Sequence, residues 1–251
     1  ADPTHMDRTA LPGEIRDTIA GPVVGCADQD DTVGWLGIPS AAPDLGELRW
    51  AAQRLPEPWQ KTREAIAVGN ACVKRWGPLV GTTGEVGQVV GNEDCLYLNV
   101  WAPRNNSDTD SKGLPVMFWI HGGGNSIGTA NTYPGHRLAG GENVVLVTIN
   151  YRLGLLGWMS HPALRGEGRS ASDASGNYGN LDMIAALEWV QKNITSFGGD
   201  PDNVTIFGES AGGLNVYSLM ASPPAKGLFH RAIAHSGSTS TTPLWRAENL
   251  T

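Results

Sequence analysis

Short apolar runs separated by glycine- and proline-rich stretches set the hydrophobic pattern of this chain. Residues 20–38 alternate glycines with short apolar runs, which predicts an antiparallel hairpin. Residues 40–92 are rich in proline, glycine and polar residues with little periodicity, so we expect surface loops with room for one short helix. Apolar runs typical of strands then follow at residues 96–101, 115–120, 144–149 and 204–207.

In the sequence, one helix is expected before the strand at residues 204–207 and another after it. Asn180 is a candidate N-cap for a helix that runs to about Asn193, with an apolar stripe at Met183, Leu187, Val190 and Ile194. A second helix is expected at residues 214–220, and the run at residues 232–234 predicts a further core strand. Strands that alternate with helices in this way predict an α/β fold with a mainly parallel central sheet and helices on both faces.

A serine lies at the apex of the turn between the strand at residues 204–207 and the helix that follows it. Residues 208–212 read Gly-Glu-Ser-Ala-Gly, with Ser210 in the centre. A nucleophilic serine on such an elbow needs very small residues two positions before and after it, because the two segments approach closely. The N-terminus of the helix also favours negative charge on an attacked carbonyl. Ser210 is therefore the candidate nucleophile, and an ordinary serine in a surface turn is the alternative.

A run of glycines follows directly after the apolar run at residues 115–120. Successive backbone N–H groups in such a run can form one concavity, which is the second arm of an oxyanion hole. The first arm is the N–H of the residue after the nucleophile, so we expect Gly123, Gly124 and Ala211 to be the donors. A flexible loop or a phosphate cradle is the alternative, and the absence of a following Gly-Lys-Ser/Thr or G-x-G-x-x-G pattern disfavours the cradle.

Composition excludes several classes of partner. The chain has 251 residues, of which 40% are hydrophobic and 17% charged, as in globular proteins. Its net charge of -7 gives no basic surface for nucleic acid, and its longest apolar runs fall short of the roughly 18 residues that span a membrane. Residues 1–6 are expected to be a cloning remnant, and residues 7–251 to belong to a single domain.

The three cysteines leave one unpaired whatever the connectivity. Cys72 and Cys95 could close a short loop, which would stabilise the fold by about 3 kcal/mol. Cys26 lies among small residues and is expected to be a buried free thiol. A bridge between Cys72 and Cys95 would favour an oxidising compartment and therefore a secreted or periplasmic protein.

Several longer motifs together resemble one family. Residues 93–100 read Glu-Asp-Cys-Leu-Tyr-Leu-Asn-Val, and residues 207–213 read Phe-Gly-Glu-Ser-Ala-Gly-Gly. Further matching motifs lie between them, in order, at residues 150–154, 176–182 and 197–201. The chain is similar in these motifs to the type B carboxylesterase and cholinesterase family of α/β-hydrolases, from about residue 21 to residue 237. The resemblance implies an α/β-hydrolase fold that is incomplete in this chain, because family members are roughly twice as long.

The resemblance also implies roles for single residues. It makes Ser210 the nucleophile, with Gly123, Gly124 and Ala211 as the oxyanion hole, and it pairs Cys72 with Cys95. The implied chemistry is hydrolysis of a small-molecule ester through an acyl-enzyme, without a metal ion or an organic cofactor.

Two other positions are expected to line the site by the same resemblance. Glu209 lines it without being the acid of the triad. Asn125 stands where the family usually has an aromatic residue, which leaves the shape of the acyl pocket open.

The chain offers no complete triad after the nucleophile. Family triads run in the order serine, acid, histidine, whereas this chain has only His230, His235 and Glu248 after Ser210, in the wrong order. His235 also follows an expected core strand, which favours a structural role. We therefore expect the acid and the histidine on the missing carboxy-terminal half, carried by a second polypeptide that arises from cleavage or split expression near residue 251.

Two alternatives to an ester hydrolase remain. The same fold includes non-catalytic relatives that act in adhesion, and loss of the acid or histidine would place this protein among them. The same serine chemistry could also act on amides, carbamates or lactones.

Overall fold

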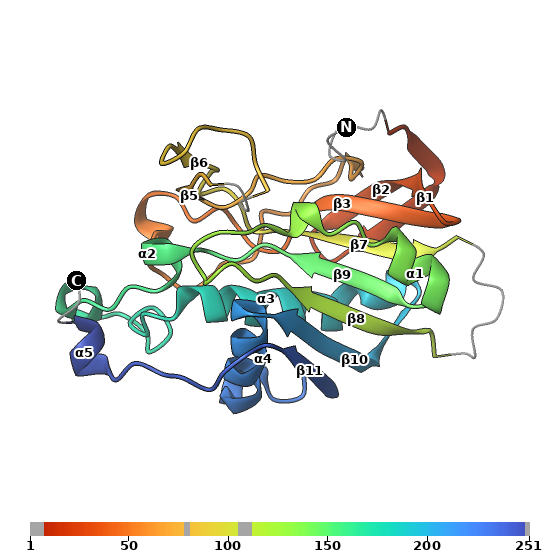
Figure 1. The fold of residues 1–251 in the computed structure, drawn as a ribbon. Coiled ribbons are helices and arrows are strands. Elements are labelled where there is room, and N and C mark those ends of the chain that lie inside the picture. Colours follow the sequence, from red (N-terminus) through yellow and green to blue (C-terminus); the bar gives the residue numbers. More distant parts are fainter. Residues whose placement is uncertain (1–7, 78–80, 105–111, 249–251) are drawn as a thin grey trace.

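In a computed structural model that describes residues 8–77, 81–104 and 112–248, the chain forms one large sheet with helices packed against it (Figure 1). The expected remnant at residues 1–6 lies outside the described residues. Neighbouring strands of the sheet are, in order, β1 (Ala10–Thr18), β2 (Gly21–Asp28), β3 (Thr32–Pro39), β7 (Tyr97–Pro103), β9 (Val145–Ile149), β8 (Leu114–Ile120), β10 (Gly199–Glu209) and β11 (Arg231–His235). The α-helices are α1 (His136–Glu142), α2 (Gly154–Gly157), α3 (Tyr178–Asn193), α4 (Ala211–Ala221) and α5 (Leu244–Glu248).

The sheet is mixed, and its two halves differ in strand direction. From β1 to β9 each strand is antiparallel to its neighbour, and this half contains the predicted hairpin as β2 and β3. From β9 through β8 and β10 to β11 all strands are parallel. The parallel half carries the predicted elbow and glycine run, because the carboxyl ends of β8 and β10 lie side by side.

Helices cover both faces of the sheet. Trp101 of β7 packs with Ala139 of α1, whereas the adjacent Val100 belongs to a cluster with Met183 of α3. Successive residues of a strand point to opposite faces, so α1 and α3 lie on opposite sides. This arrangement confirms the predicted α/β-hydrolase class, with a mixed sheet.

The start of α3 differs from the prediction. The helix begins at Tyr178 with Asn177 as N-cap, so Asn180 lies inside the first turn and does not cap the helix. Packing sets this start: Tyr178 is fully buried, and a Cβ on Gly179 would lie 2.4 Å from the Trp158 ring. The apolar pattern favoured Asn180 because this residue precedes the stripe.

The strand β11 is not the core strand that the sequence predicted. It pairs with β10 on one side only among the described residues, and Ile233 is 41% exposed. His235 at its end is exposed too. The short run at residues 232–234 is apolar, but no other described segment packs over it enough to bury it.

The segment of residues 40–92 contributes short elements as well as loops. β4 (Arg63–Glu64) pairs with β2, and β5 (Lys74–Arg75) pairs with β6 (Val89–Val90). Short 3₁₀ turns here and later in the chain span Gly46–Leu48, Ala130–Thr132, Pro162–Arg165, Ile194–Phe197 and Pro223–Ala225. The segment is tied down by the Cys72–Cys95 disulfide, with Cα atoms 4.9 Å apart, and Cys26 is buried and free as predicted.

Replacing both bridged cysteines by alanine is expected to destabilise the protein, because the disulfide closes a loop of 23 residues. The expected loss is about 3 kcal/mol, which lowers Tm by roughly 10 °C. Thermal unfolding of wild type, C72A/C95A and a C26A control, each with and without reductant, measures it. A Tm of C72A/C95A equal to that of wild type would contradict this account.

Candidate active site

Ser210 forms the whole connection between β10 and α4. The strand ends at Glu209 and the helix begins at Ala211. Ser210 has φ 57° and ψ −120°, a strained conformation for a residue with a side chain. Its N–H donates to the His235 carbonyl (2.9 Å), and its carbonyl accepts from the Leu214 N–H (3.0 Å). These backbone bonds hold the strained residue, and its side chain is exposed at the end of the sheet.

The glycines of the elbow sit where no side chain fits. A Cβ on Gly212 would lie 2.1 Å from the Ile120 carbonyl oxygen of β8. A Cβ on Gly208 would lie 2.5 Å from the Gly212 carbonyl carbon. The spacing of small residues around Ser210 therefore has the physical reason that the sequence suggested, which is close approach of the backbones.

The glycine run at the end of β8 is in contact with this elbow. A Cβ on Gly122 would lie 2.7 Å from the Glu209 carbonyl oxygen and 3.3 Å from the Ser210 Cβ. Gly123 has φ 107° and Gly124 has φ 62°, in the region that glycine adopts readily. The run thus turns away from β8 directly beside the serine.

The three expected oxyanion donors lie in a closed turn and at the start of a helix. The Gly123 carbonyl accepts from Ser126 N (3.1 Å) and Ile127 N (3.0 Å), which closes the turn, while the N–H groups of Gly123 and Gly124 donate no backbone hydrogen bond within the described residues. Ala211 occupies the first position of α4, where the N–H has no partner within the helix and the dipole is positive. The positive end of the α4 dipole therefore favours negative charge beside Ser210.

His121 is a structural residue of the glycine run. Its Nδ1 lies 2.8 Å from the Gly122 carbonyl, which can only accept, so this nitrogen carries the proton. Its ring stacks on Tyr151 with centroids 4.3 Å apart. Burial lowers the pKa of His121 to about 4, the Gly122 hydrogen bond opposes the shift, and the Lys74 charge adds to it. A buried histidine that stays neutral suits a support for the loop.

Asn125 and Glu209 flank the glycine run and the serine. Asn125 has φ 56°, and its carbonyl accepts from the Gly154 N–H (2.7 Å). Its side chain pairs with Asn215 of α4, a buried residue that the sequence patterns did not single out. The Glu209 side chain is exposed. Burial of Tyr133 raises the pKa of that tyrosine, and the charge of Glu209 raises it further.

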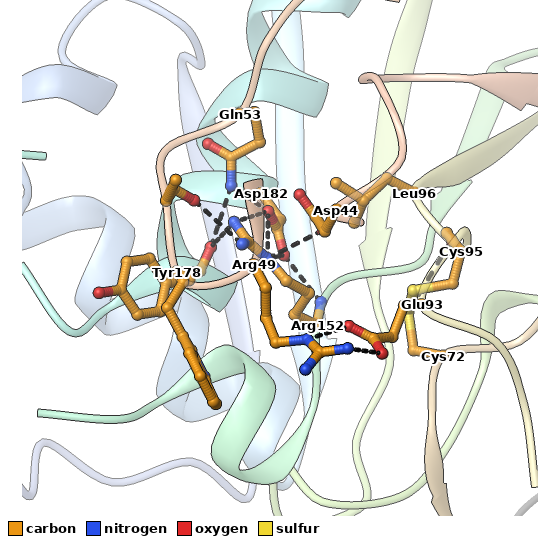
Figure 2. Close-up of polar contacts among 12 residues, drawn as sticks. Asp44, Arg49, Gln53, Cys72, Glu93, Cys95, Leu96, Arg152, Tyr178 and Asp182 are labelled. Atoms are coloured by element: carbon orange, nitrogen blue, oxygen red, sulfur yellow. Dashed lines mark hydrogen bonds and ion pairs between the residues drawn. A yellow bond between two sulfur atoms is a disulfide. The ribbon is translucent and has the colours of Figure 1, made fainter. Parts of the chain in front are cut away.

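A buried ionic cluster fixes the segment that follows β9 (Figure 2). Arg152 donates from Nε and Nη2 to Asp182 of α3 at 2.9 and 2.7 Å, and its backbone N–H binds the same carboxylate at 2.8 Å. Asp44 lies 3.1 Å from Arg152 Nε. Burial and the charge of Asp182 raise the pKa of Asp44 to about 8, against the effect of Arg152. The cluster anchors the neighbouring Tyr151, whose hydroxyl donates to the His121 carbonyl (2.6 Å).

The described residues bring no triad partner to Ser210. His230 accepts a hydrogen bond from the Val204 N–H through Nδ1 (3.1 Å), and Glu248 forms an ion pair with Arg165. His235 meets the serine through its backbone carbonyl. Among the described residues, no group of three or more His, Cys, Asp and Glu side chains could hold a metal ion.

A strained serine between a parallel strand and a helix, with a glycine run beside it, places the chain among the α/β-hydrolases. The carboxylesterase family model matches residues 13–249. The chain belongs to the carboxylesterase family.

Similar proteins include esterases from bacteria and mammals. The para-nitrobenzyl esterase of Bacillus subtilis (strain 168) is 46% identical over 95% of this chain and 45% of its own length. Carboxylesterase 1C of Rattus norvegicus is 47% identical over 84% of this chain and 38% of its own. The fumonisin B1 esterase of Sphingopyxis macrogoltabida is 44% identical over 91% of this chain and 41% of its own. A solved PNB esterase structure superposes with a TM-score of 0.83 and 42% identity over 94% of this chain and 47% of that chain. This chain thus spans about half the length of its relatives, or less.

No helix of the described residues combines the length and the hydrophobicity needed to cross a membrane.

Replacing His121 by asparagine is expected to make the protein less sensitive to acid. The pKa of His121 lies below its usual value, so the unfolded chain takes up this proton first and stability falls between about pH 6.5 and pH 4. Asparagine keeps a donor for Gly122 without this titration. Urea unfolding at about pH 7 and about pH 4.5 should show wild type losing about 2 to 3 kcal/mol more than H121N. Equal losses would show that His121 is protonated in the fold.

The two carboxylates of the buried cluster are expected to differ in importance. Asp182→Asn should cost about 3 kcal/mol or more, because it leaves the Arg152 charge buried without its bidentate partner. Asp44→Asn should change stability by less than about 1 kcal/mol near pH 7, because the raised pKa keeps Asp44 largely protonated there. Chemical denaturation of both variants compares them. An equal cost for D44N would mean that Asp44 is ionised and necessary to Arg152.

Proposed function

We propose that this chain carries the nucleophile and the oxyanion hole of a carboxylic ester hydrolase. The observation that carries the proposal is the strained Ser210, exposed between β10 and the N-terminus of α4 and in contact with the glycine run. Such an elbow presents a hydroxyl to a substrate while the backbone N–H groups around it face developing negative charge. Membership of the carboxylesterase family supports the same chemistry.

In the proposed reaction, Ser210 Oγ attacks the ester carbonyl carbon and its proton passes to a histidine base. The carbonyl oxygen becomes an oxyanion and accepts hydrogen bonds from the N–H groups of Gly123, Gly124 and Ala211. When it re-forms the carbonyl, the alcohol leaves with the proton from the histidine, and an acyl-serine remains. Water, deprotonated by the same histidine, then attacks the acyl carbon. The bond to Ser210 Oγ breaks, the histidine returns the proton to Oγ, and the acid is released. Glu209 lines the site, and no step uses a metal ion or an organic cofactor.

The histidine base and its acid are proposed to come from outside the 251 residues. Residues 7–251 would then be the amino-terminal part of a single α/β-hydrolase domain. The exposure of β11 supports this. His230 and Glu248 also support it, because they bind Val204 and Arg165 and not Ser210. The relatives are single chains about twice as long as this one or longer, so the expected second polypeptide has no support from the comparisons.

The substrate is proposed to be a small-molecule ester. The names of the relatives refer to a para-nitrobenzyl esterase and a fumonisin B1 esterase, which differ widely in substrate. Asn125, beside the glycine run, is the position in the described residues where this chain departs from the expected aromatic residue. A panel of esters, amides, carbamates and lactones assayed with the whole protein should show the highest kcat/KM for esters.

Fluorophosphonate labelling tests the nucleophile. The protein expressed from its complete reading frame should gain one phosphonyl group, located on Ser210 by peptide mass analysis. Ser210→Ala should abolish labelling and lower hydrolysis of a para-nitrophenyl ester by about 10⁴-fold or more. A wild-type protein that folds and remains unlabelled would favour the alternative, a non-catalytic binding relative of the same fold.

A further inference from the structure

Two asparagine side chains form a closed pair between the glycine run and the nucleophile helix. Asn215 Nδ2 donates to Asn125 Oδ1 at 2.8 Å, and Asn125 Nδ2 donates to Asn215 Oδ1 at 3.2 Å. Asn125 follows Gly124 directly, and Asn215 lies in α4, five residues after Ser210. The pair therefore joins the segment that carries two expected oxyanion donors to the helix that carries the serine.

The pair is costly to break because Asn215 is fully buried. Its neighbours along the buried side of α4 include Val216 and Leu219, which offer no hydrogen bonds from their side chains. A buried amide without a hydrogen-bond partner destabilises the fold by the full free energy of its desolvation. The hydrogen bonds of Asn215 therefore stabilise the conformation of the glycine run that places the Asn125 side chain next to Asn215.

The backbone at Asn125 matches this role. Its φ of 56° lies in the left-handed region, where asparagine is enriched and aromatic or branched residues are strained. Its carbonyl is also held by the Gly154 N–H. Both the side chain and the main chain of Asn125 are thus fixed at the carboxyl end of the glycine run.

The amino end of the glycine run is held by a different residue. The Tyr151 hydroxyl donates to the His121 carbonyl at 2.6 Å. Tyr151 and the pair of asparagines therefore hold opposite ends of the run that contains Gly122, Gly123 and Gly124.

We propose that Asn125 and Asn215 are positioning residues that hold the N–H groups of Gly123 and Gly124 in a fixed place relative to the Ser210 hydroxyl. The inference rests on the proposed function, because it assigns these residues to the oxyanion hole of that reaction. Donors held in place before the reaction need no reorganisation when charge develops on the carbonyl oxygen. The pair acts through the glycine run and does not itself contact the reacting atoms.

The test compares Asn125→Gly, Asn215→Leu and the double variant with wild type. Glycine keeps the left-handed backbone of Asn125, and leucine fills the space of Asn215 without a polar group. Asn143→Gly is the matched control, because Asn143 also has a positive φ of 52° but caps α1 away from the serine. All variants are made in the protein expressed from its complete reading frame.

Three readouts separate positioning from simple stability. Each single variant should lower kcat and the rate of phosphonylation by roughly 10²-fold with KM nearly unchanged, because small misplacement of donors weakens transition-state binding. The double variant should be no worse than either single one, since each removes the same pair. Amide exchange at residues 122–128 should rise in all three variants and stay at the wild-type level in N143G.

The outcomes distinguish this inference from the proposed function. Losses that add in the double variant, or a lower Tm with an unchanged phosphonylation rate, would overturn the positioning role and leave the proposed function intact. A wild-type protein that the fluorophosphonate never labels would overturn both.

Discussion

The close approach of the β8 backbone to Gly212 is the constraint on which the site depends. The Ile120 carbonyl occupies the space that a Cβ at Gly212 would need, at 2.1 Å. Parallel pairing of β8 with β10 brings the ends of both strands to the same edge of the sheet. The elbow after β10 and the glycine run after β8 are thereby forced together. The strain at Ser210 is a consequence of this packing, which fixes the direction of the backbone on both sides of the serine.

Buried polar groups then determine how the loops around the elbow are placed. Arg152 and Asp182 fix the segment after β9, and that segment presents Tyr151 to the glycine run. The pair of Asn125 and Asn215 acts on the other end of the run. Each of these groups would be costly without its partner, so the loops have few alternative positions. A glycine-rich segment, which is flexible by composition, is held by the side chains of Tyr151 and Asn215 from two other parts of the chain.

Much of the fold could be predicted because apolar runs and glycine spacing reflect local requirements. The strands β7, β8, β9 and β10 and the elbow follow from such runs, and the motifs at residues 93–100 and 207–213 are enough to indicate the carboxylesterase class. The start of α3 and the exposure of β11 could not be predicted in the same way. The first depends on the contact of Gly179 with Trp158, and the second on the place of β11 at the edge of the sheet in the described residues.

The candidate site shows the same division. Ser210, Gly123, Gly124 and Ala211 lie in short motifs with a known geometry, so the sequence was enough to nominate them. Asn215 was missed because its partner lies 90 positions away in the chain. A signal was present all the same, since a polar residue beside Val216 on the buried side of an apolar helix needs a partner. Asn125 was noticed only as a departure from an aromatic residue.

The crystal structure of the whole protein with a phosphonyl group on Ser210 tests the central claim most directly. If the elbow and the glycine run form an oxyanion hole, one phosphonyl oxygen will lie about 2.7 to 3.1 Å from the backbone nitrogens of Gly123, Gly124 and Ala211. A phosphonyl group on Ser210 whose oxygens face solvent or bind other donors would contradict the account.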